Sequence, residues 1–397
     1  MRIGIDCLAI KANYRGGINS YLLGLVDGFK STDKNNTFVL FCTVKNSSLF
    51  SEYKNIDNFE LIIIDDVKIK FGKYILLLPL LFNSLYLWEK VTNIYNNMLG
   101  LKKIIENNCD ILYTPTTVLN FYNLKIPTLL SMHDIQHHHY PEFFSNIRLR
   151  WRRLSFKNSA KFTTYFQASS KFIHDDLLTI FNEIKKEQIQ VISEGVNIKE
   201  FSQTRNIDLQ KEFDIPDKFI FFPAQLWKHK NHITVLKALK KLECEGLIIP
   251  LVMTGDKYSA SDEILNYIKD NDMHYVKYLG KIDFKYLVAL YQQAAYLITA
   301  TLYESSSLPI LEAAASSTPI IASNTSPNVE MSQNIKMNLF TPLSIEECSD
   351  IIKVCWSNST EDINDQVIVN NKNIFKYSWD NVASQYIDFI KGKLNVK

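Results

Sequence analysis

Two glutamates, Glu304 and Glu312, flank a short serine-rich segment and are the side chains in this sequence best placed to bind hydroxyl groups. The apolar run 295–301 before them has the length of a buried strand. Pro309 suits the start of a helix, because its fixed φ is helical and its missing N–H is not needed there. The segment is therefore predicted to be a strand, a loop and a helix N-terminus, whose free N–H groups bind phosphate. A ligand that carries both hydroxyls and phosphate, such as a nucleotide-sugar, fits this arrangement.

Two further segments that could contact a ligand follow predicted strands in the first half of the chain. Gly16 and Gly17 come after the first strand and open the first helix, where glycines let a phosphate or a sugar approach the backbone. His133 and Asp134 come directly after the strand 128–132. A neutral imidazole can form hydrogen bonds with sugar hydroxyls, and the adjacent aspartate can orient it.

The histidine-rich run 133–139 and one acidic run are the candidates for a metal site. His133 and His137 have the i, i+4 spacing that places two ligands on one helix face. Pro141 and the preceding strand end disfavour a regular helix here, and no cysteine lies near. The run 270–272 matches Asp-x-Asp but falls at a polar helix end, so it is predicted to be a solvated loop. No metal is expected.

Two lysines, Lys228 and Lys230, lie in the loop after the predicted strand 218–223. Their ammonium groups are placed where a diphosphate would need its charge neutralised. Asn231 is predicted to cap the helix that follows. Lysines in a polar loop are often simply solvated, so the position in the fold rather than the charge favours a role in binding.

Apolar runs alternate with amphipathic stretches along the whole chain, and this rhythm predicts an α/β protein with parallel sheets and crossover helices. Ligands in such folds bind beyond the carboxyl ends of the strands, where Glu304 is expected. The predicted strands are 3–8, 37–44, 60–64, 111–113, 128–132, 218–223, 247–254, 275–279, 295–301 and 319–323, and the predicted helices are 17–30, 90–107, 146–158, 231–243, 260–271 and 283–294.

The chain of 397 residues, with 46% hydrophobic content, is long enough for two domains. The stretch 194–217 mixes charges without periodicity and is the candidate boundary. The expected domains are 1–200, on the acceptor side, and 201–377, which binds the nucleotide-sugar. The amphipathic pattern of 378–397 predicts a last helix that crosses back to the first domain.

Charge and cysteine usage exclude some classes of function. Lys+Arg 44 against Asp+Glu 42 leaves a formal net charge of +2, which argues against a nucleic-acid partner. Six scattered cysteines without a Cys-x-x-Cys pair predict a reduced, intracellular protein. Asp6 interrupts the N-terminal apolar run, so no signal peptide is expected.

Two segments raise the question of a membrane contact. The apolar segment 74–88 is shorter than a transmembrane span, and both a buried helix and a helix on a membrane surface remain open. The basic, aromatic stretch 148–153, with Lys157 and Lys161, fits either a membrane-surface contact or a solvated helix face.

The ordered set formed by Gly16-Gly17, His133-Asp134, Lys230-Asn231 and the Glu304-x7-Glu312 pair resembles glycosyltransferase family 4. The runs 133–144 and 227–232 are similar to bacterial O-antigen and capsule enzymes, many of them mannosyltransferases. The likeness covers about residues 1 to 390. It implies the GT-B fold, in which two Rossmann-like, doubly wound domains face a central cleft.

The resemblance also implies a role for each matched residue. Lys230 would hold the donor diphosphate, and the backbone N–H of Leu308 would hold a phosphate oxygen. Glu304 would face the donor sugar, and Glu312 would accept the ribose hydroxyls. His133 would contact the sugar near the reacting carbon. The catalytic set is thus His133, Lys230 and Glu304, and the donor-binding set is Gly16, Gly17, Asp134, Gln225, Lys228, Ile282, Ser306, Ser307, Leu308 and Glu312.

Two positions depart from the family pattern. Gln225 stands where the family usually has an arginine that shares the phosphate charge, so Lys228 compensates or the donor binds more weakly. The family commonly has glycines where this chain has Ser305, Ser306 and Ser307. Serines keep the N–H groups and add hydroxyls, but they restrict the backbone. Both changes bear on the identity of the donor more than on the chemistry.

The function that the resemblance implies is a retaining, metal-independent transfer of a hexose without a cofactor. The donor would be a UDP- or GDP-sugar, GDP-mannose among them, and the acceptor a glycan, in particular a lipid-linked O-antigen or capsule intermediate. The enzyme would work in the cytoplasm, also as a peripheral protein on the inner face of the membrane. Two alternatives stay open: a sugar-nucleotide epimerase or hydrolase of the same fold, and a non-catalytic sugar-nucleotide-binding subunit.

Overall fold

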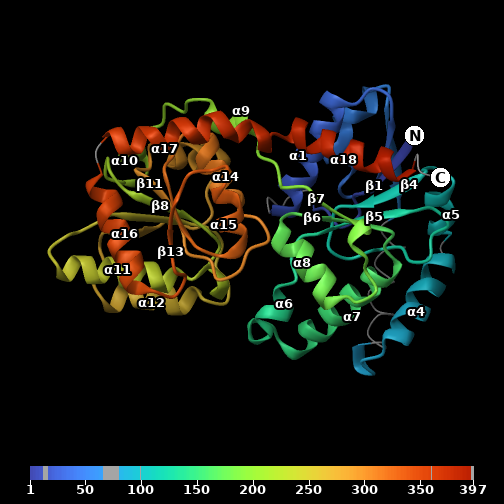
Figure 1. Ribbon diagram of the computed structural model, residues 1–397, viewed down its shortest axis with the longest axis horizontal. Helices are drawn as coiled ribbons and strands as arrows, with labels where there is room; N and C mark the ends of the chain where they lie inside the picture. The colour runs from blue at the N-terminus through green and yellow to red at the C-terminus, as the bar shows by residue number, and fades with distance from the viewer. Residues whose placement is uncertain (12–16, 66–79, 99, 359, 395–397) are drawn as a thin grey trace. The chain divides into compact units, whose positions relative to one another are not determined.

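The computed structural model describes residues 1–11, 17–65, 80–98, 100–358 and 360–394 (Figure 1). The chain divides into two compact units. Unit 1 comprises Met1–Glu194 and Val382–Lys397, and unit 2 comprises Gly195–Asn381. The sequence analysis set the corresponding boundaries after residues 200 and 377.

Unit 1 is built on a seven-stranded parallel sheet with the order β3-β2-β1-β4-β5-β6-β7. The order runs outward from β1 in both directions, so the sheet is doubly wound. Its central strands β1, β4 and β5 are buried along almost their whole length, as expected where helices cover both faces of a parallel sheet. The strands are β1 (Arg2–Asp6), β2 (Thr37–Thr43), β3 (Phe59–Ile64), β4 (Ile111–Thr114), β5 (Thr128–Met132), β6 (Tyr165–Ala168) and β7 (Ile189–Val191).

The helices of unit 1 include two that the sequence predicted as one. The predicted helix 90–107 is wrong as a single element: Gly100 has a left-handed backbone, with φ +67°, and separates α4 from α5. Glycine adopts this conformation without steric cost, and it ends the first helix. The main helices are α1 (Gly17–Thr32), α4 (Leu85–Met98), α5 (Leu101–Glu106), α7 (Asn146–Phe162), α8 (Lys171–Ile180) and the part of α18 (Trp379–Leu394) from Val382 onward.

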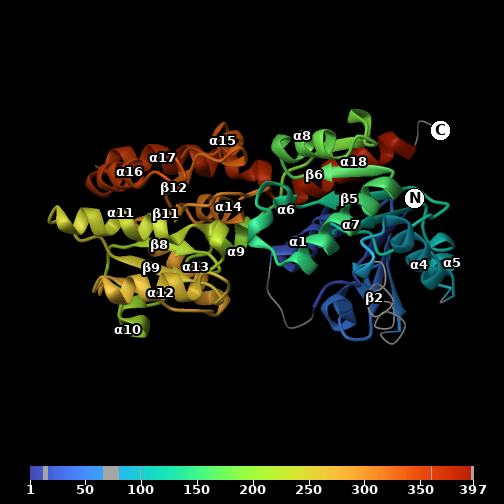
Figure 2. The same cartoon turned by 90° about the horizontal axis from the view of Figure 1, so that it is seen from below.

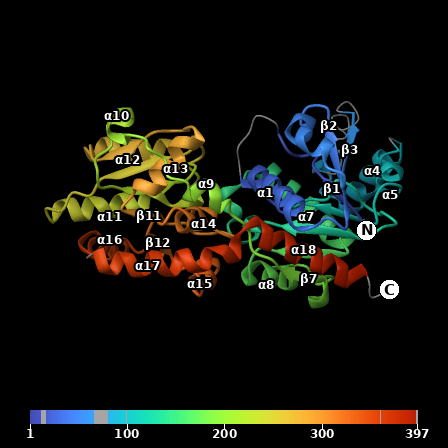
Figure 3. The ribbon, with the colours of Figure 1, turned by 90° about the horizontal axis from the view of Figure 1, so that it is seen from above.

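Unit 2 is built on a six-stranded parallel sheet with the order β10-β9-β8-β11-β12-β13. Figures 2 and 3 show α12 toward the β9 side of this sheet, with α16 and α17 toward β12. The strands are β8 (Ile220–Pro223), β9 (Leu251–Thr254), β10 (Val276–Tyr278), β11 (Tyr296–Thr299), β12 (Ile320–Ser323) and β13 (Asn338–Phe340), and the main helices are α11 (His232–Cys244), α12 (Ser261–Asp270), α13 (Phe284–Gln293), α14 (Leu308–Ala315), α15 (Ser326–Ser332), α16 (Ile345–Ser357) and α17 (Thr360–Asn373).

The two parallel, doubly wound sheets confirm the α/β class. The stretch 194–217, the candidate boundary, begins at the division between Glu194 and Gly195 and also holds α9 (Ile198–Ser202) and α10 (Leu209–Phe213). Phe201 and Leu209 of these helices are buried in the core of unit 2. The stretch is therefore part of a folded unit rather than a linker.

The first and last segments of unit 2 lie side by side. Val196 forms a parallel β-bridge with Ser378, and its N–H donates to the carbonyl of Tyr377 at 2.8 Å. Gly195 lies against the indole of Trp379 so closely that a Cβ at this position would be 2.6 Å from the ring. The contact requires glycine, since real Cβ atoms do not approach to that distance. The chain thus enters and leaves unit 2 at one place.

In the described part of the chain, no helix has both the length and the apolar composition that crossing a membrane requires. Of the apolar segment 74–88, residues 74–79 lie outside the described ranges. Trp88 is buried in unit 1, whereas Tyr86 is 61% exposed. The described part of the segment therefore supplies both a core residue and a surface residue.

Candidate functional site

The loop between β11 and α14 forms the centre of the candidate site in unit 2. α14 begins at Leu308 with Pro309 in its first turn, as predicted. The N–H of Leu308 donates to no acceptor in the described part of the chain. The hydroxyls of Ser306 and Ser307 are buried, and they too have no hydrogen-bond partner among the described residues. Buried polar groups are normally paired, so these donors at a helix N-terminus fit an anionic ligand.

Glu304 forms an ion pair with Lys230. Both side chains are largely buried, with 15% and 19% of their surfaces exposed. The two residues that the sequence assigned to the sugar and to the diphosphate are therefore neighbours in unit 2. Each neutralises the charge of the other in the absence of a ligand.

The loop that carries Lys230 is held to the end of β11 by main-chain contacts. The N–H of Leu302 donates to the carbonyl of His229 at 2.7 Å. Asn231 has a left-handed backbone, and its amide donates to the carbonyls of Ala300 and Pro342 at 3.0 and 2.6 Å. The predicted capping role is wrong in detail, because this side chain bridges two loops and accepts no bond from the N–H groups of α11.

Gln225, which replaces the family arginine, lies in the same loop and is only partly free. Its side-chain oxygen accepts a hydrogen bond from the Trp227 indole at 2.9 Å, and that indole stacks on Tyr258 at 3.9 Å. Because the side-chain oxygen faces the indole, the NH₂ group, which is the hydrogen-bond donor, points away from it. Lys228 is exposed and makes no ion pair with a described residue, so its charge is available to compensate for the missing arginine.

Glu312 lies in the second turn of α14 and is partly buried. Tyr291 donates its hydroxyl to this carboxylate at 2.6 Å. Burial raises the pKa of Glu312 to about 7, although the Tyr291 hydrogen bond acts in the opposite direction. Ile282, also assigned to the donor site, packs against the core of unit 2.

In unit 1, His133 follows β5 and is buried. Its Nε2 lies 2.7 Å from the carbonyl of Pro115, and its Nδ1 lies 3.5 Å from the carboxylate of Glu194. Tyr21 packs edge-on against the ring, with centroids 4.7 Å apart. Burial lowers the pKa of His133, but the hydrogen bond and the charge of Glu194 outweigh it, so the pKa is raised.

The sequence suggested Asp134 as the acidic partner of His133. In the structure the partner is Glu194. Asp134 forms an ion pair with Arg152, which also lies over the rings of Phe144 and Phe156. No sequence signal pointed to Glu194, because it comes from a distant segment. Of the two glycines assigned to the site, Gly17 is the exposed first residue of α1, and Gly16 lies outside the described residues.

Four buried hydroxyl groups cluster beside His133, and sequence analysis did not find them. Tyr21, Tyr113 and Tyr386 meet Ser131 through contacts that link α1, β4, β5 and α18. A mutually bonded cluster of this kind fixes the positions of its members, since any displaced hydroxyl would be left buried without a partner. The ring of Tyr21 is thereby held against His133.

The histidine run does not form a metal centre in the described structure. His137 is buried against Phe156, and burial lowers its pKa to about 4. Among the described residues, no group of three or more histidine, cysteine or acidic side chains is placed to hold a metal ion. The i, i+4 spacing of His133 and His137 has a packing explanation.

The chain is similar to known glycosyltransferases. Residues 203–372 match the model of the glycosyl transferases group 1 family. An uncharacterized glycosyltransferase of Methanocaldococcus jannaschii is 27% identical over 240 residues, which are 56% of this chain and 58% of that protein. The O-antigen chain mannosyltransferase RfbU of Salmonella typhimurium is 28% identical over 197 residues, 49% of this chain and 51% of its own length. The matches thus span little more than half of these relatives.

Solved structures match the chain over its whole length. Anabaena HepE in complex with UDP and glucose has a TM-score of 0.72 at 14% identity, covering 99% of this chain and 100% of that one. Sucrose-phosphate synthase from Thermosynechococcus elongatus has a TM-score of 0.67 at 16% identity, covering 100% of both. These likenesses show the fold, and they confirm the predicted GT-B class. Residues 203–372 therefore match the glycosyl transferases group 1 family, within a chain that has the GT-B fold.

Proposed function

We propose that this protein is a retaining glycosyltransferase that moves a hexose from a nucleotide-sugar to a glycan acceptor without a metal ion. The observation that carries the proposal is the N-terminus of α14. Its free Leu308 N–H and the unpartnered hydroxyls of Ser306 and Ser307 lie between two carboxylates that suit sugar and ribose hydroxyls.

The ion pair between Lys230 and Glu304 supports a mechanism in which the donor breaks this pair and provides a new partner for each side chain. The donor diphosphate would take Lys230, and a sugar hydroxyl would take Glu304, so neither charge is left buried alone. When the bond to the sugar breaks, negative charge develops on the leaving phosphate. Lys230 and the N–H groups of α14 stabilise that charge, which is usually the largest contribution to catalysis. The leaving phosphate oxygen accepts the proton of the acceptor hydroxyl.

The donor is proposed to be a UDP- or GDP-linked hexose. UDP and glucose are bound in the similar HepE structure, and a similar curated protein is a mannosyltransferase. In this chain Gln225 cannot supply the charge of an arginine. The exposed Lys228 in the same loop is expected to supply it instead.

The acceptor is proposed to be lipid-linked, and unit 1 has a surface that suits a membrane. α4 and α7 pack together and expose apolar side chains among basic ones. Arg152, part of the predicted basic stretch, does not belong to this surface, because it is bound to Asp134. Lys161 pairs with Glu89. The exposed side chains proposed to form it, on these helices and just before α4, are Leu81, Phe82, Tyr86, Ile94, Ile147, Arg148, Arg150, Trp151 and Arg153.

The membrane contact is tested by sedimentation with liposomes that contain anionic lipids. The protein should sediment with them, and replacing Arg148, Arg150 and Arg153 with glutamine should abolish this, because the attraction to anionic lipids is electrostatic. Liposomes of neutral lipid alone are the control. A triple variant that still sediments fully would refute the role of these arginines.

Transfer is tested with UDP-hexoses and GDP-mannose, with and without a lipid-linked glycan. Nucleoside diphosphate released only when the acceptor is present supports the proposal. Conversion without acceptor indicates an epimerase or hydrolase, and binding without turnover indicates a non-catalytic subunit. Lys230→Ala should lower kcat by about 10²–10³-fold, as for loss of one oxyanion donor. Lys237→Ala, an exposed position on α11, is the matched control.

A further inference from the structure

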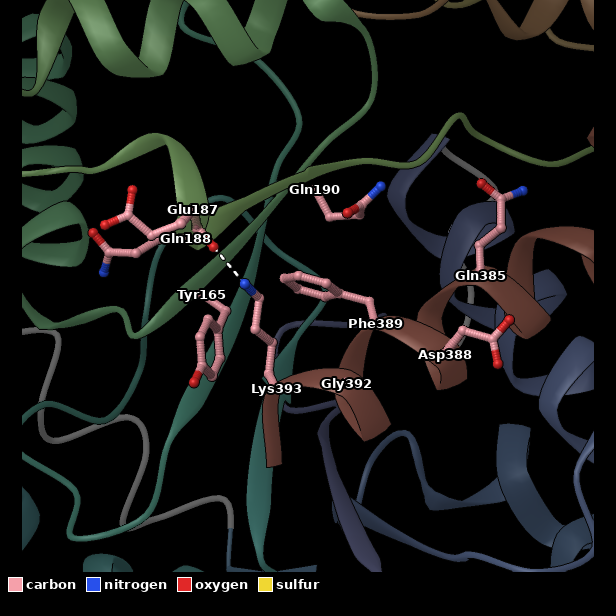
Figure 4. Close-up of a pocket in the computed structure, with 9 residues that line it drawn as sticks. All are labelled: Tyr165, Glu187, Gln188, Gln190, Gln385, Asp388, Phe389, Gly392 and Lys393. Carbon is pink, nitrogen blue, oxygen red and sulfur yellow. Dashed lines mark hydrogen bonds between the residues drawn. The ribbon is translucent and has the colours of Figure 1, made fainter. Parts of the chain in front are cut away.

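A groove of ≈ 750 Å³ lies on unit 1, apart from the residues described above (Figure 4). Tyr165, the first residue of β6, forms part of its lining. In the sheet Tyr165 pairs with Leu129, whereas His133 follows the far end of β5 after Met132. The groove is therefore at the amino ends of the strands, roughly 13 Å along the sheet from His133 at about 3.3 Å per residue.

One wall of the groove is aromatic. Tyr165 and Phe389 meet edge to face, with ring centroids 5.9 Å apart and planes at 80°. The ammonium of Lys393 lies over both rings, and it donates to the carbonyl of Glu187 at 2.6 Å. This lysine is thus already engaged, and Figure 4 shows it between Tyr165 and Phe389, with its hydrogen bond to Glu187. The wall offers a fixed apolar surface.

The remaining lining, here called the polar wall, consists of amides and carboxylates. Gln385 and Asp388 lie on α18, on the same helix face as Phe389, and Gln190 lies on β7. Asp388 is exposed and forms no ion pair within the described ranges. Amides both donate and accept hydrogen bonds, and a carboxylate accepts them. This wall therefore suits hydroxyl groups.

The charge of the lining excludes anionic ligands. Glu187 and Asp388 contribute two carboxylates against the single ammonium of Lys393. A phosphate, a nucleotide or an anionic lipid would be repelled. A ligand with an apolar face for the rings and hydroxyls for the polar wall, and without negative charge, fits best.

Gly392 also leaves room for a ligand in this groove. It lies within α18 and lines the groove, and nothing lies within 4 Å of where its Cβ would be. Packing therefore does not require a glycine here, although glycine weakens a helix relative to other residues. Its effect is to leave the groove open beside the aromatic wall.

We propose that this groove binds a neutral oligosaccharide, as a second carbohydrate site distinct from the transfer site. The apolar C–H face of a sugar ring packs against Tyr165 and Phe389, and its hydroxyls bond to Gln190, Gln385 and Asp388. For its natural ligand the inference rests on the proposed function: the saccharide is part of the glycan that the enzyme extends. Such a site would retain a growing glycan between transfer events.

Saturation-transfer NMR with mannotriose and maltotriose as probes tests the proposal on the full chain. At least one saccharide should give a transfer signal on the wild-type protein. Phe389→Ala should weaken the signal at least tenfold, and Gly392→Met should abolish it by filling the groove. Because methionine is the better helix former, Gly392→Met should unfold at the same temperature or a higher one, which separates lost binding from lost folding. Lys391→Met, a neighbouring position outside the groove, should leave the signal unchanged.

Two results would overturn the proposal: no signal with either probe, or a signal that Gly392→Met and Phe389→Ala leave intact. Thermal stabilisation by UDP and GDP, measured on the same variants, reports the donor site in unit 2. Saccharide binding without a nucleotide effect would refute the proposed function alone. Nucleotide binding without a saccharide signal would refute the groove alone.

Discussion

Glu312 combines two demands that conflict at neutral pH. To accept the ribose hydroxyls of the proposed donor its carboxylate is best ionised, yet burial raises its pKa to about 7 in the folded protein. Between the ordinary pKa of a glutamate and a pH of about 7, the folded state therefore keeps a proton on Glu312 that the unfolded state has released. Stability falls as pH rises through this window, and the ionised form is held at a cost.

Replacing Glu312 with glutamine should remove this dependence. The variant should be about 1–2 kcal/mol more stable than the wild type near pH 8 and equally stable near pH 4, since only the ionised carboxylate is penalised. It should also lose the thermal shift caused by UDP or GDP. Unfolding curves at several pH values measure both effects. Tyr291→Phe removes the hydroxyl that stabilises the ionised carboxylate, so stability should fall more steeply with pH. Parallel plots of stability against pH for all three proteins would disprove the raised pKa of Glu312.

His133 lies between two acceptors, the carbonyl of Pro115 and the carboxylate of Glu194. Two acceptors require two ring protons, so this geometry favours an imidazolium paired with Glu194. Asp134, the adjacent carboxylate, acts in the same direction, and Tyr21 packs on the ring. The stability that this pair contributes is present below the ordinary histidine pKa and is lost as pH rises through the raised one.

Glu194→Gln should lower the pKa of His133 by about one unit or more, because both the charge and the hydrogen bond to it disappear. The imidazole resonances of His133, assigned from their absence in a His133→Gln variant, measure this pKa by NMR. If the proposed function holds, the pH at which activity declines should move down by a similar amount. An unchanged titration would show that Glu194 does not set the charge of the ring.

At the scale of elements, the turn after β9 holds the loop of Gln225 in place. Gly255 has φ +131°, and a Cβ there would be 2.5 Å from the carbonyl oxygen of Ala224. Gly255→Ala should therefore destabilise the protein by roughly 2–3 kcal/mol and weaken the nucleotide-induced thermal shift. Gly246→Ala is the control, since its φ is also positive but its Cβ would meet nothing, and about 1 kcal/mol is expected. Urea unfolding of both variants measures the two losses of stability. Equal losses would refute the role of the close contact between Gly255 and Ala224.

The elements that could be predicted from sequence are those with a clear apolar pattern, such as β2, which has an unbroken apolar run between two threonines. β6 and β7 were missed because they are short and interrupted by glutamines. Gln167 of β6 is buried only because its amide donates to the carbonyl of Ile192 at 2.6 Å. In the site, Glu304, Glu312 and Lys230 follow strands or open helices and could be found by position. Glu194 and Tyr291 could not, because their partners come from distant elements.

For the whole molecule, α18 carries the chain out of unit 2 and along unit 1, and Tyr386 anchors it in the buried hydroxyl cluster. Tyr386→Phe should cost about 1–2 kcal/mol, because the hydroxyls of Tyr21 and Ser131 each lose a buried partner. Tyr386→Ala should cost about 3–5 kcal/mol through the added cavity. Chemical denaturation measures both, and a Tyr386→Phe protein as stable as the wild type would show that the cluster adds nothing.

The bridge between Val196 and Ser378 makes unit 2 an insertion cassette: one continuous stretch whose two ends meet, set into an otherwise discontinuous unit 1. A cassette of this kind can be exchanged without rethreading the rest of the chain, since only two adjacent junctions must be matched. If the proposed function holds, grafting a related Gly195–Asn381 segment onto the same host would change donor preference and leave acceptor preference as it was.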